Sequence, residues 1–483
     1  MVNPVVDAPV GLQEAARIAI DLGAESCRVS LLRWKSGKPS IEVIHRIANG
    51  PVHRGAELHW PLQTILDGLE EGLRKAAAVA TEGIASIAVD SWAVDYVRLG
   101  RDGKPLGEPF CYRDERTVAS KEAADKLATH ELLFSRTGAQ PLRLNTIYQL
   151  MADPASGIDP HAPWVCMPEY VLYWLGGKRV AEYTNATHTG LVDIKTGDWA
   201  LDLFELLGIP IDAAPRIVPS GTILGHVKGP LASLPAFCET QLIAPACHDT
   251  ASAIAGIPTG LNDTAYICSG TWSLVGTLVQ TPITHTDALQ ARYTNQGAAG
   301  GGFCFHTNVN GMWTLKQCMD GWSAEGRPCE IEELVSKAAD CKTVPGTIDV
   351  DAESLLLDGK MPERINQELK SRGLPQIADV AGNEPQFARL IFESLASRYA
   401  NALAHLELML GRKLGRIHIL GGGSKNKLLT EMTATRTGLP VESGQPESST
   451  IGNLAVQLAA SEANGKPLSA ESVRRWAEML CQS

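Results

Sequence analysis

The sequence has no surplus of basic residues, no long apolar run and no clustered cysteines. It carries 43 Lys and Arg against 54 Asp and Glu, a formal net charge of −11, so we expect no general nucleic-acid binding. No apolar run approaches the roughly 20 residues that a membrane-spanning helix needs. The eleven cysteines form no CxxC pair, so a zinc site is not indicated. Scattered thiols predict a reducing, cytoplasmic location.

The sequence is instead balanced like that of a globular protein, with 44% hydrophobic and 20% charged residues. Its 483 residues predict two large domains. The first residues, MVNPVVDAPVGLQEAAR, lack a basic start followed by an apolar core. We therefore interpret them as a loose leader before the first strand and not as a secretory signal.

The order of the predicted elements indicates the fold class. Residues 17–34 have the pattern of strand, tight turn and strand, residues 40–49 of a third strand, residues 62–80 of an amphipathic helix, and residues 84–89 of a buried strand. This order is typical of the ribonuclease-H-like unit, an α/β fold with a mixed sheet. Residues 265–279 repeat the strand–turn–strand plan. The sequence therefore predicts two such units with a ligand-binding cleft between them.

Other segments complete the predicted organisation. We expect one helix over residues 117–138, a polar surface insertion over residues 341–375, and a long amphipathic helix over residues 387–410 that ends at Gly411. We predict the following division of the chain: an N-terminal domain at 16–256, a C-terminal domain at 257–464, and a final helix at 465–483.

Asp249 is the first candidate for chemistry. It follows an apolar run that ends in Cys247 and opens a helix of small residues. Asp is a favoured helix N-cap, and its residue type alone favours that interpretation. A carboxylate here is also placed to accept the proton of a substrate hydroxyl and direct its oxygen at a γ-phosphate.

Other candidates each have a structural alternative. Asp21 could anchor Mg²⁺ or form a turn. The glycines 421–423, followed by Ser424 and Asn426, could admit a nucleotide to the backbone, although their spacing matches neither a P-loop nor GxGxxG. Trp92 and Asp95 could form a sugar wall or ordinary core. His248 could bind a sugar hydroxyl or pack, and Asn308 and Asn310 could be ligands or caps.

Taken in chain order, these motifs resemble the FGGY family of carbohydrate kinases, most closely its rhamnulokinases. The resemblance runs from about residue 18 to 460 and is carried by the following strings: IAIDLGAESCRVSLL, AVDSWAVDY, YRDERT, NTIYQL, EYTNATHTGLVDI, CHDTASAI, SGTWSLVG, NVNGMW and GGGSKN. It implies two actin-like ATPase domains that close on a sugar and Mg·ATP, in a monomer or homodimer.

The resemblance also implies roles for particular residues. Asp249 is the expected catalytic base in the transfer of phosphate from ATP to L-rhamnulose, which gives L-rhamnulose 1-phosphate. The sugar-side candidates are His248, Asp249, Thr250, Trp92, Ala93, Asp95 and Asn308. The nucleotide-side candidates are Ala24, Glu25, Ser26, Cys27, Arg28, Thr271, Lys316, Gly422 and Asn426, and Asp21 is the candidate for Mg²⁺.

Three residues depart from the family pattern. Cys27 and Ala93 stand where Gly is common, and Lys316 stands where Gln is often found. The methyl group of Ala93 can exclude a positive φ, which bears on the choice of sugar, so L-fuculose and L-xylulose are alternative substrates.

A non-catalytic sugar or nucleotide sensor on the same scaffold is the alternative from another class. The presence of Asp21 and Asp249 favours an enzyme. The roughly seventeen residues before the first strand are also too few for a helix-turn-helix. An actin-like polymerising protein is less expected still.

Overall fold

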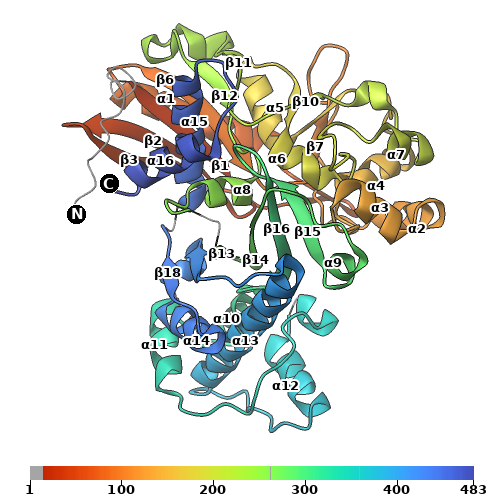
Figure 1. Ribbon diagram of the computed structural model, residues 1–483, viewed down its shortest axis with the longest axis vertical. Helices are drawn as coiled ribbons and strands as arrows, with labels where there is room; N and C mark the ends of the chain where they lie inside the picture. The colour runs from red at the N-terminus through yellow and green to blue at the C-terminus, as the bar shows by residue number, and fades with distance from the viewer. Residues whose placement is uncertain (1–14, 261–262, 358, 446, 483) are drawn as a thin grey trace.

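The computed structural model describes residues 15–260, 263–357, 359–445 and 447–482, and most of the expected leader lies outside them. Two six-stranded sheets, each with its own helices, make up the protein. In Figure 1 the N-terminal sheet lies in the broad upper body, the C-terminal sheet runs through the middle, and the narrower lower body consists mainly of helices. This arrangement confirms the predicted α/β class with two sheet-containing domains.

The N-terminal sheet has the strand order β11-β12-β6-β1-β2-β3. Its central strand β1 is antiparallel to β2 and parallel to β6, and all seven of its residues are buried. Burial on both faces explains the nearly continuous apolar sequence ARIAIDL. The strands are β1 (Ala16–Leu22), β2 (Ser26–Lys35), β3 (Lys38–Ala48), β6 (Ile84–Ser91), β11 (Thr222–His226) and β12 (Gln241–Ala244).

The C-terminal sheet, of order β15-β16-β14-β13-β17-β18, repeats this plan. Its central strand β13 is antiparallel to β14 and parallel to β17, as β1 is to β2 and β6. The duplication predicted from residues 265–279 is therefore confirmed. The strands are β13 (Thr264–Ser269), β14 (Trp272–Val279), β15 (Tyr293–Gly297), β16 (Phe303–Asn310), β17 (Arg416–Leu420) and β18 (Val441–Ser443).

Helices cover both sheets. Leu66, Leu69 and Leu73 of α1 (Leu62–Val79) belong to the core of the N-terminal sheet. In the lower body of Figure 1, α13 (Glu384–Leu410) is the long buried helix. It begins three residues earlier than predicted, with Pro385 in its first turn, where the missing N–H has no helical partner to lose. Around it lie α10 (Trp313–Ala324), α11 (Ile331–Asp340), α12 (Met361–Ser371) and α14 (Lys427–Thr437).

A smaller α/β region connects β6 to β11 on the right of Figure 1. The single helix predicted over residues 117–138 is wrong, because Ala128 is extended and Thr129 caps a second helix by accepting a hydrogen bond from the Leu132 amide, 3.2 Å away. The helices and strands of this connecting region are β7 (Tyr96–Arg98), α2 (Thr117–Leu127), α3 (His130–Thr137), α4 (Thr146–Ala152), β8 (Trp164–Cys166), α5 (Met167–Trp174), β9 (Val180–Glu182), α6 (Tyr183–Ala186), α7 (Leu201–Leu206) and β10 (Arg216–Val218).

The polar insertion predicted over residues 341–375 is also wrong in part. Within it, α12 buries Met361, Ile365 and Leu369 in the core of the C-terminal domain. These apolar residues recur every four positions, a helical signal that the surrounding Pro, Gly and charged residues obscured. The remaining short elements are β4 (Val52–Arg54), β5 (Glu57–His59), α9 (Thr286–Gln290) and α16 (Ala470–Leu480).

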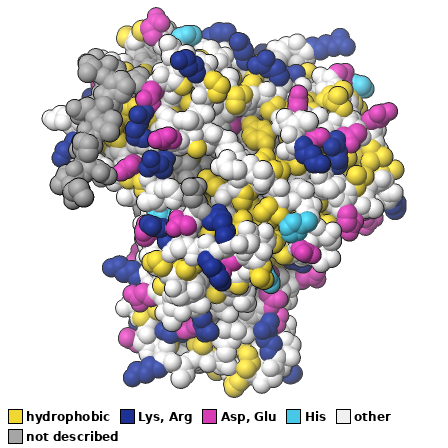
Figure 2. All heavy atoms as spheres, viewed as in Figure 1, with side chains coloured by type: hydrophobic (Ala, Val, Ile, Leu, Met, Phe, Trp, Pro, Cys, Tyr) yellow, Lys and Arg dark blue, Asp and Glu magenta, His cyan; other side chains and the backbone are white. Residues whose placement is uncertain are grey.

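On the face drawn in Figure 2, acidic and basic side chains are interspersed and form no large patch of one charge. None of the helices in the described ranges combines the length and the apolar character needed to cross a bilayer.

The chain returns to the N-terminal sheet after completing the C-terminal one. The returning helix is α15 (Ser448–Ala463), which packs on β1 and β6 and crosses α8 (Asp249–Ala255). A Cβ placed on Gly452 of α15 would lie 1.7 Å from the carbonyl oxygen of Ser252 in α8. The two helices therefore approach each other so closely that only glycine fits at this crossing.

Replacing Gly452 with Ala should destabilise the protein by at least about 2 kcal/mol, because the methyl group would collide with backbone. Gly321→Ala is the matched control, since Gly321 also lies within a helix, α10, and no atom lies within 4 Å of its added Cβ. The control should leave stability unchanged or raise it by up to about 1 kcal/mol. Thermal unfolding measures both, and equal melting temperatures would contradict the close crossing.

Candidate active site

Three carboxylates come together where the two domains meet. Asp21 is the next-to-last residue of β1, and Asp90 lies beside it in register on the parallel strand β6. Asp249 is the first residue of α8, which follows the next strand of the sheet, β12. The carboxyl ends of parallel strands lie at one edge of a sheet, so residues 21, 90 and 249 share one location despite their separation in sequence.

Asp249 is not the N-cap of α8. The N-cap position belongs to His248, and the Asp249 Oδ1 accepts hydrogen bonds from the amide and hydroxyl of Thr250, at 2.5 and 3.2 Å. Although 36% of its side chain is exposed, burial among neighbouring groups, followed by the charge of Asp21, raises the pKa of Asp249 to about 7. A carboxylate with such a pKa can accept a proton near neutral pH.

Asp90 was not singled out from the sequence, although it is the one carboxylate in the otherwise apolar and small-residue strand IASIAVDS. It is fully buried, and its Oδ2 accepts a hydrogen bond of 2.6 Å from Asn453 of α15. None of the described residues donates to its Oδ1. Burial, followed by the charge of Asp21, raises the pKa of Asp90 well above its usual value.

Asp21 is held by two partners. Arg28 forms an ion pair with its Oδ2, and Ser449 of α15 donates a hydrogen bond of 2.5 Å to the same oxygen. Arg28 also pairs with Glu447 at 2.5 Å. The candidate Mg²⁺ anchor is therefore linked to residues just before and within α15.

The predicted phosphate turn lies between β1 and β2. A Cβ on Gly23 would lie 2.5 Å from the Ser26 carbonyl oxygen, so the tight turn requires glycine. Ala24, Glu25 and Ser26 are at least partly exposed there. Cys27, in contrast, points into the core, and burial raises the pKa of its thiol to about 12. The side chain of Cys27 is therefore not available to a ligand.

Trp92 and Asp95 contact each other inside the protein. Asp95 is fully buried; its Oδ2 accepts hydrogen bonds from Trp60 at 2.6 Å and Trp92 at 3.0 Å, and its Oδ1 accepts one from Gln149 at 3.0 Å. Trp92 packs on Trp60 with ring centroids 4.3 Å apart. These contacts are those of the core alternative, and a sugar contact through either side chain stays a prediction.

The positive φ that we considered for Ala93 falls on the next residue. Val94 has φ of 73°, an unusual conformation for a β-branched residue and one that concentrates at functional sites. Its carbonyl oxygen accepts hydrogen bonds from Thr146 at 2.7 Å and Gln149 at 3.2 Å. Ala93 itself is half-buried and is compatible with its backbone, so its methyl group causes no strain of this kind.

His248 packs against another histidine and also lies close to the carboxylate of Asp249. Its ring centroid is 3.8 Å from that of His188, and its Nε2 lies 3.3 Å from Asp249 Oδ1. Burial lowers the pKa of His248 to about 3, so the imidazole is neutral beside the carboxylate. Asn308, on β16, is exposed, whereas Asn310 is buried and bonded to Val350 and Thr314.

The glycine turn predicted to bind the nucleotide has both crowded and open positions. Added Cβ atoms on Gly421 and Gly423 would meet Ser269 at 2.9 and 2.0 Å, whereas Gly422 faces open space. Asn426 caps α14 through its Oδ1, which accepts from the Leu429 amide at 3.1 Å, and none of the described residues accepts a bond from its buried Nδ2.

Thr271 adjoins the start of α10, the helix that carries Lys316, because the Trp313 amide donates to the Thr271 carbonyl oxygen at 3.2 Å. Thr271 forms the half-buried turn between β13 and β14. Lys316 pairs with Asp320 at 2.9 Å, and that hydrogen bond, together with the charges of Asp320 and Glu25, raises the pKa of Lys316.

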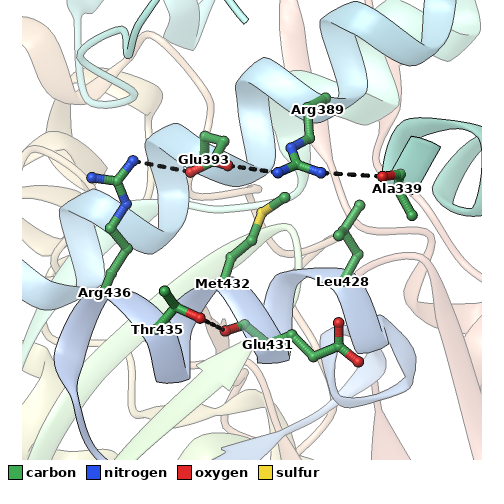
Figure 3. A pocket seen from close by; sticks show the side chains of 8 residues that line it. All are labelled: Ala339, Arg389, Glu393, Leu428, Glu431, Met432, Thr435 and Arg436. Carbon is green, nitrogen blue, oxygen red and sulfur yellow. Dashed lines mark hydrogen bonds and ion pairs between the residues drawn. The ribbon is translucent and has the colours of Figure 1, made fainter. Parts of the chain in front are cut away.

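A separate hollow of about 330 Å³ lies between α13 and α14, as Figure 3 shows. Glu393 accepts hydrogen bonds there from Arg389 at 2.9 Å and Arg436 at 3.1 Å. Glu393, Arg389 and Arg436 are thus paired with one another, and none of the predicted site residues lines the hollow.

Comparison with known proteins identifies the family. The N-terminal domain of the FGGY family of carbohydrate kinases matches residues 16–256, and the C-terminal domain of that family matches residues 265–461. The chain belongs to the FGGY family of carbohydrate kinases. It is therefore a sugar kinase with the actin-like ATPase fold.

The FGGY relatives include close sequence matches over most of the chain. The rhamnulokinase of Bacteroides thetaiotaomicron is 33% identical over 91% of this chain and 89% of its own length. A rhamnulokinase of Yersinia pestis is 34% identical with the same coverage. The crystal structure of a xylulose kinase from Lactobacillus acidophilus superposes with a TM-score of 0.76 at 17% identity, over 97% of each chain.

The site's residues fit the Mg·ATP that FGGY kinases imply. Of the three carboxylates, Asp21 pairs with Arg28, and the buried Oδ1 of Asp90 has no protein donor among the described residues. Among the residues that the structure describes, no three or more His, Cys, Asp or Glu side chains are placed so that all of them could bind one metal ion directly. Mg²⁺ retains several waters and needs only one or two carboxylates, and Gly422 leaves open space for a nucleotide.

Asp90→Asn should stabilise the metal-free kinase more at pH 8 than at pH 5. A carboxyl whose pKa is higher in the folded state loses stabilisation as the pH rises through that value, whereas Asn keeps the acceptor for Asn453 and does not ionise. We expect the melting-temperature difference from wild type to grow by at least about 2 °C between the two pH values in EDTA. An equal melting-temperature difference at the two pH values would contradict the raised pKa of Asp90.

Proposed function

We propose that this FGGY kinase transfers phosphate from ATP to L-rhamnulose and forms L-rhamnulose 1-phosphate. The observation that carries the proposal is the match to rhamnulokinases over 91% of the chain, combined with a carboxylate of raised pKa at the start of α8. We further propose a cytoplasmic protein that acts as a monomer or homodimer.

In the proposed reaction Asp249 accepts the proton of the sugar's 1-hydroxyl as that oxygen attacks the γ-phosphorus, and ADP leaves. Thr250 orients the carboxylate with two hydrogen bonds, at 2.5 and 3.2 Å. The neutral His248, 3.3 Å from Asp249 Oδ1, adds no positive charge that would lower the basicity of Asp249. Positioning and charge complementarity dominate phosphoryl transfer, which is consistent with this sparse machinery.

We assign the sugar side to His248, Thr250, Ala93 and Asn308, with Trp92 and Asp95 behind them. The turn at residues 24–28, with Thr271, Lys316, Gly422 and Asn426, is assigned to ATP. Asp21 would hold Mg²⁺ through water, with the buried Asp90 adding negative charge. When bound, Mg²⁺ neutralises charge on the transferred phosphoryl group.

Another ketose is the second candidate substrate. A xylulose kinase has a TM-score of 0.76 with this chain, and identity near one third leaves room for altered contacts to a sugar.

A panel of sugars tests the proposal. We expect ADP release with L-rhamnulose to have a kcat/KM at least about tenfold above that with L-fuculose, L-xylulose, D-ribulose or glycerol. A preference for another ketose would contradict the substrate alone, whereas no turnover on any member would contradict the kinase.

Asp249→Asn should lower kcat by at least about 100-fold, because the amide cannot accept the proton. Because Asn has nearly the same shape as Asp, the Kd for ADP, measured by calorimetry, should stay within about threefold of wild type. Near-normal turnover by this variant would show that another group is the base.

A further inference from the structure

Glu182 is a fully buried carboxylate that the proposed reaction does not use. It lies at the end of β9, within the string EYTNATHTG, and 0% of its surface is exposed. No lysine or arginine contacts it among the described residues. A buried acid without a cationic partner is costly, so its hydrogen bonds must account for its presence.

Those hydrogen bonds come from four donors. Oε1 accepts from the Thr184 amide at 3.1 Å and the Ser220 hydroxyl at 2.6 Å. Oε2 accepts from the Thr184 hydroxyl at 2.6 Å and the Cys247 amide at 2.9 Å. Each oxygen therefore receives one backbone N–H and one hydroxyl.

The bond to Cys247 reaches the segment that presents Asp249. Cys247 lies two residues before Asp249, and the next amide, that of His248, donates to the Thr184 hydroxyl at 3.3 Å. On the other side, the Ser91 amide donates to the Cys247 carbonyl oxygen at 2.9 Å. The backbone before Asp249 is thus held by Glu182 and Thr184 on one side and by the end of β6 on the other.

We infer that Glu182 is a positioning residue: its carboxylate holds the Cys247–His248 backbone so that Asp249 projects toward the substrate hydroxyl. This inference rests on the proposed role of Asp249 as base. A displacement of about 1 Å at a reacting group can cost on the order of 100-fold in rate. The two bonds from consecutive amides provide the restraint that prevents such a displacement.

The hydrogen-bond pattern makes Glu182→Gln a sharp test. An amide NH₂ cannot accept a hydrogen bond, and each carboxylate oxygen faces a backbone N–H. In either orientation, Gln therefore loses the Thr184 amide or the Cys247 amide. The variant keeps the volume of the side chain and puts an NH₂ group against one of these two backbone amides and the hydroxyl beside it.

Glu169→Gln is the matched control. Glu169 is also fully buried and accepts bonds from the Glu182 amide at 2.9 Å and from Asn185 Nδ2 at 3.0 Å. A Gln at this position can keep both contacts if the Asn185 amide rotates by half a turn, because Asn185 Oδ1 has no donor among the described residues. The control touches β9 but not the Cys247 segment.

We expect Glu182→Gln to lower kcat by about 10- to 100-fold, with the KM for ATP and the Kd for ADP within about twofold of wild type. Glu169→Gln should keep kcat within about twofold. Wild-type kcat in Glu182→Gln, or equal losses in both variants, would overturn the inference.

A double-mutant cycle separates positioning from general damage. If Glu182 acts through Asp249, adding Glu182→Gln to Asp249→Asn should change the residual kcat by less than about twofold. A full additional loss would overturn the inference. Near-normal turnover by Asp249→Asn alone would instead contradict the proposed base.

Thr184→Val keeps the test decisive if Glu182→Gln does not fold. It removes the hydroxyl that bonds both Glu182 and the His248 amide while preserving shape. We expect kcat to fall by at least about fivefold with ADP binding retained, and an unchanged kcat would overturn the inference.

Discussion

The structure depends on how three carboxylates are held together at one place with little opposing charge. The charge of Asp21 raises the pKa of both Asp90 and Asp249, and Arg28 forms an ion pair with Asp21. In a buried environment such a group is unfavourable unless a cation or a proton compensates it. The same imbalance that destabilises the isolated protein therefore suits it to Mg·ATP and gives Asp249 a pKa near neutrality.

This group of carboxylates also explains why the C-terminal part of the chain returns to the N-terminal sheet. Ser449, Asn453 and Gln457 recur every four residues on one face of α15 and donate to Asp21, Asp90 and the carbonyl oxygen of Ile18. The close crossing of α8 and α15 at Gly452 fixes that face in place. A helix that follows the C-terminal sheet thus completes the surroundings of the predicted metal anchor.

Much of the fold was predictable because local patterns and global structure agree. The apolar strands at residues 17–34 and 265–279 and the amphipathic helix over 387–410 carry strong periodic signals, and the repeated plan indicates two domains. The failures occurred where a local signal was weak or masked. Thr129 interrupts the helix predicted over 117–138, and three apolar residues of α12 are spread through a polar segment.

The sequence by itself determined the family and the two-domain α/β architecture, because ordered motifs and burial patterns are local properties of the chain. It also determined Asp21 and Asp249 as candidates, since each stands at the end of a strand or the start of a helix. Only the tertiary structure decided that Asp90 adjoins them, that Cys27 and Asp95 point inward, and that Glu182 accepts a hydrogen bond from the Cys247 amide. Those facts depend on strand register and on contacts between residues distant in sequence, which no local pattern encodes.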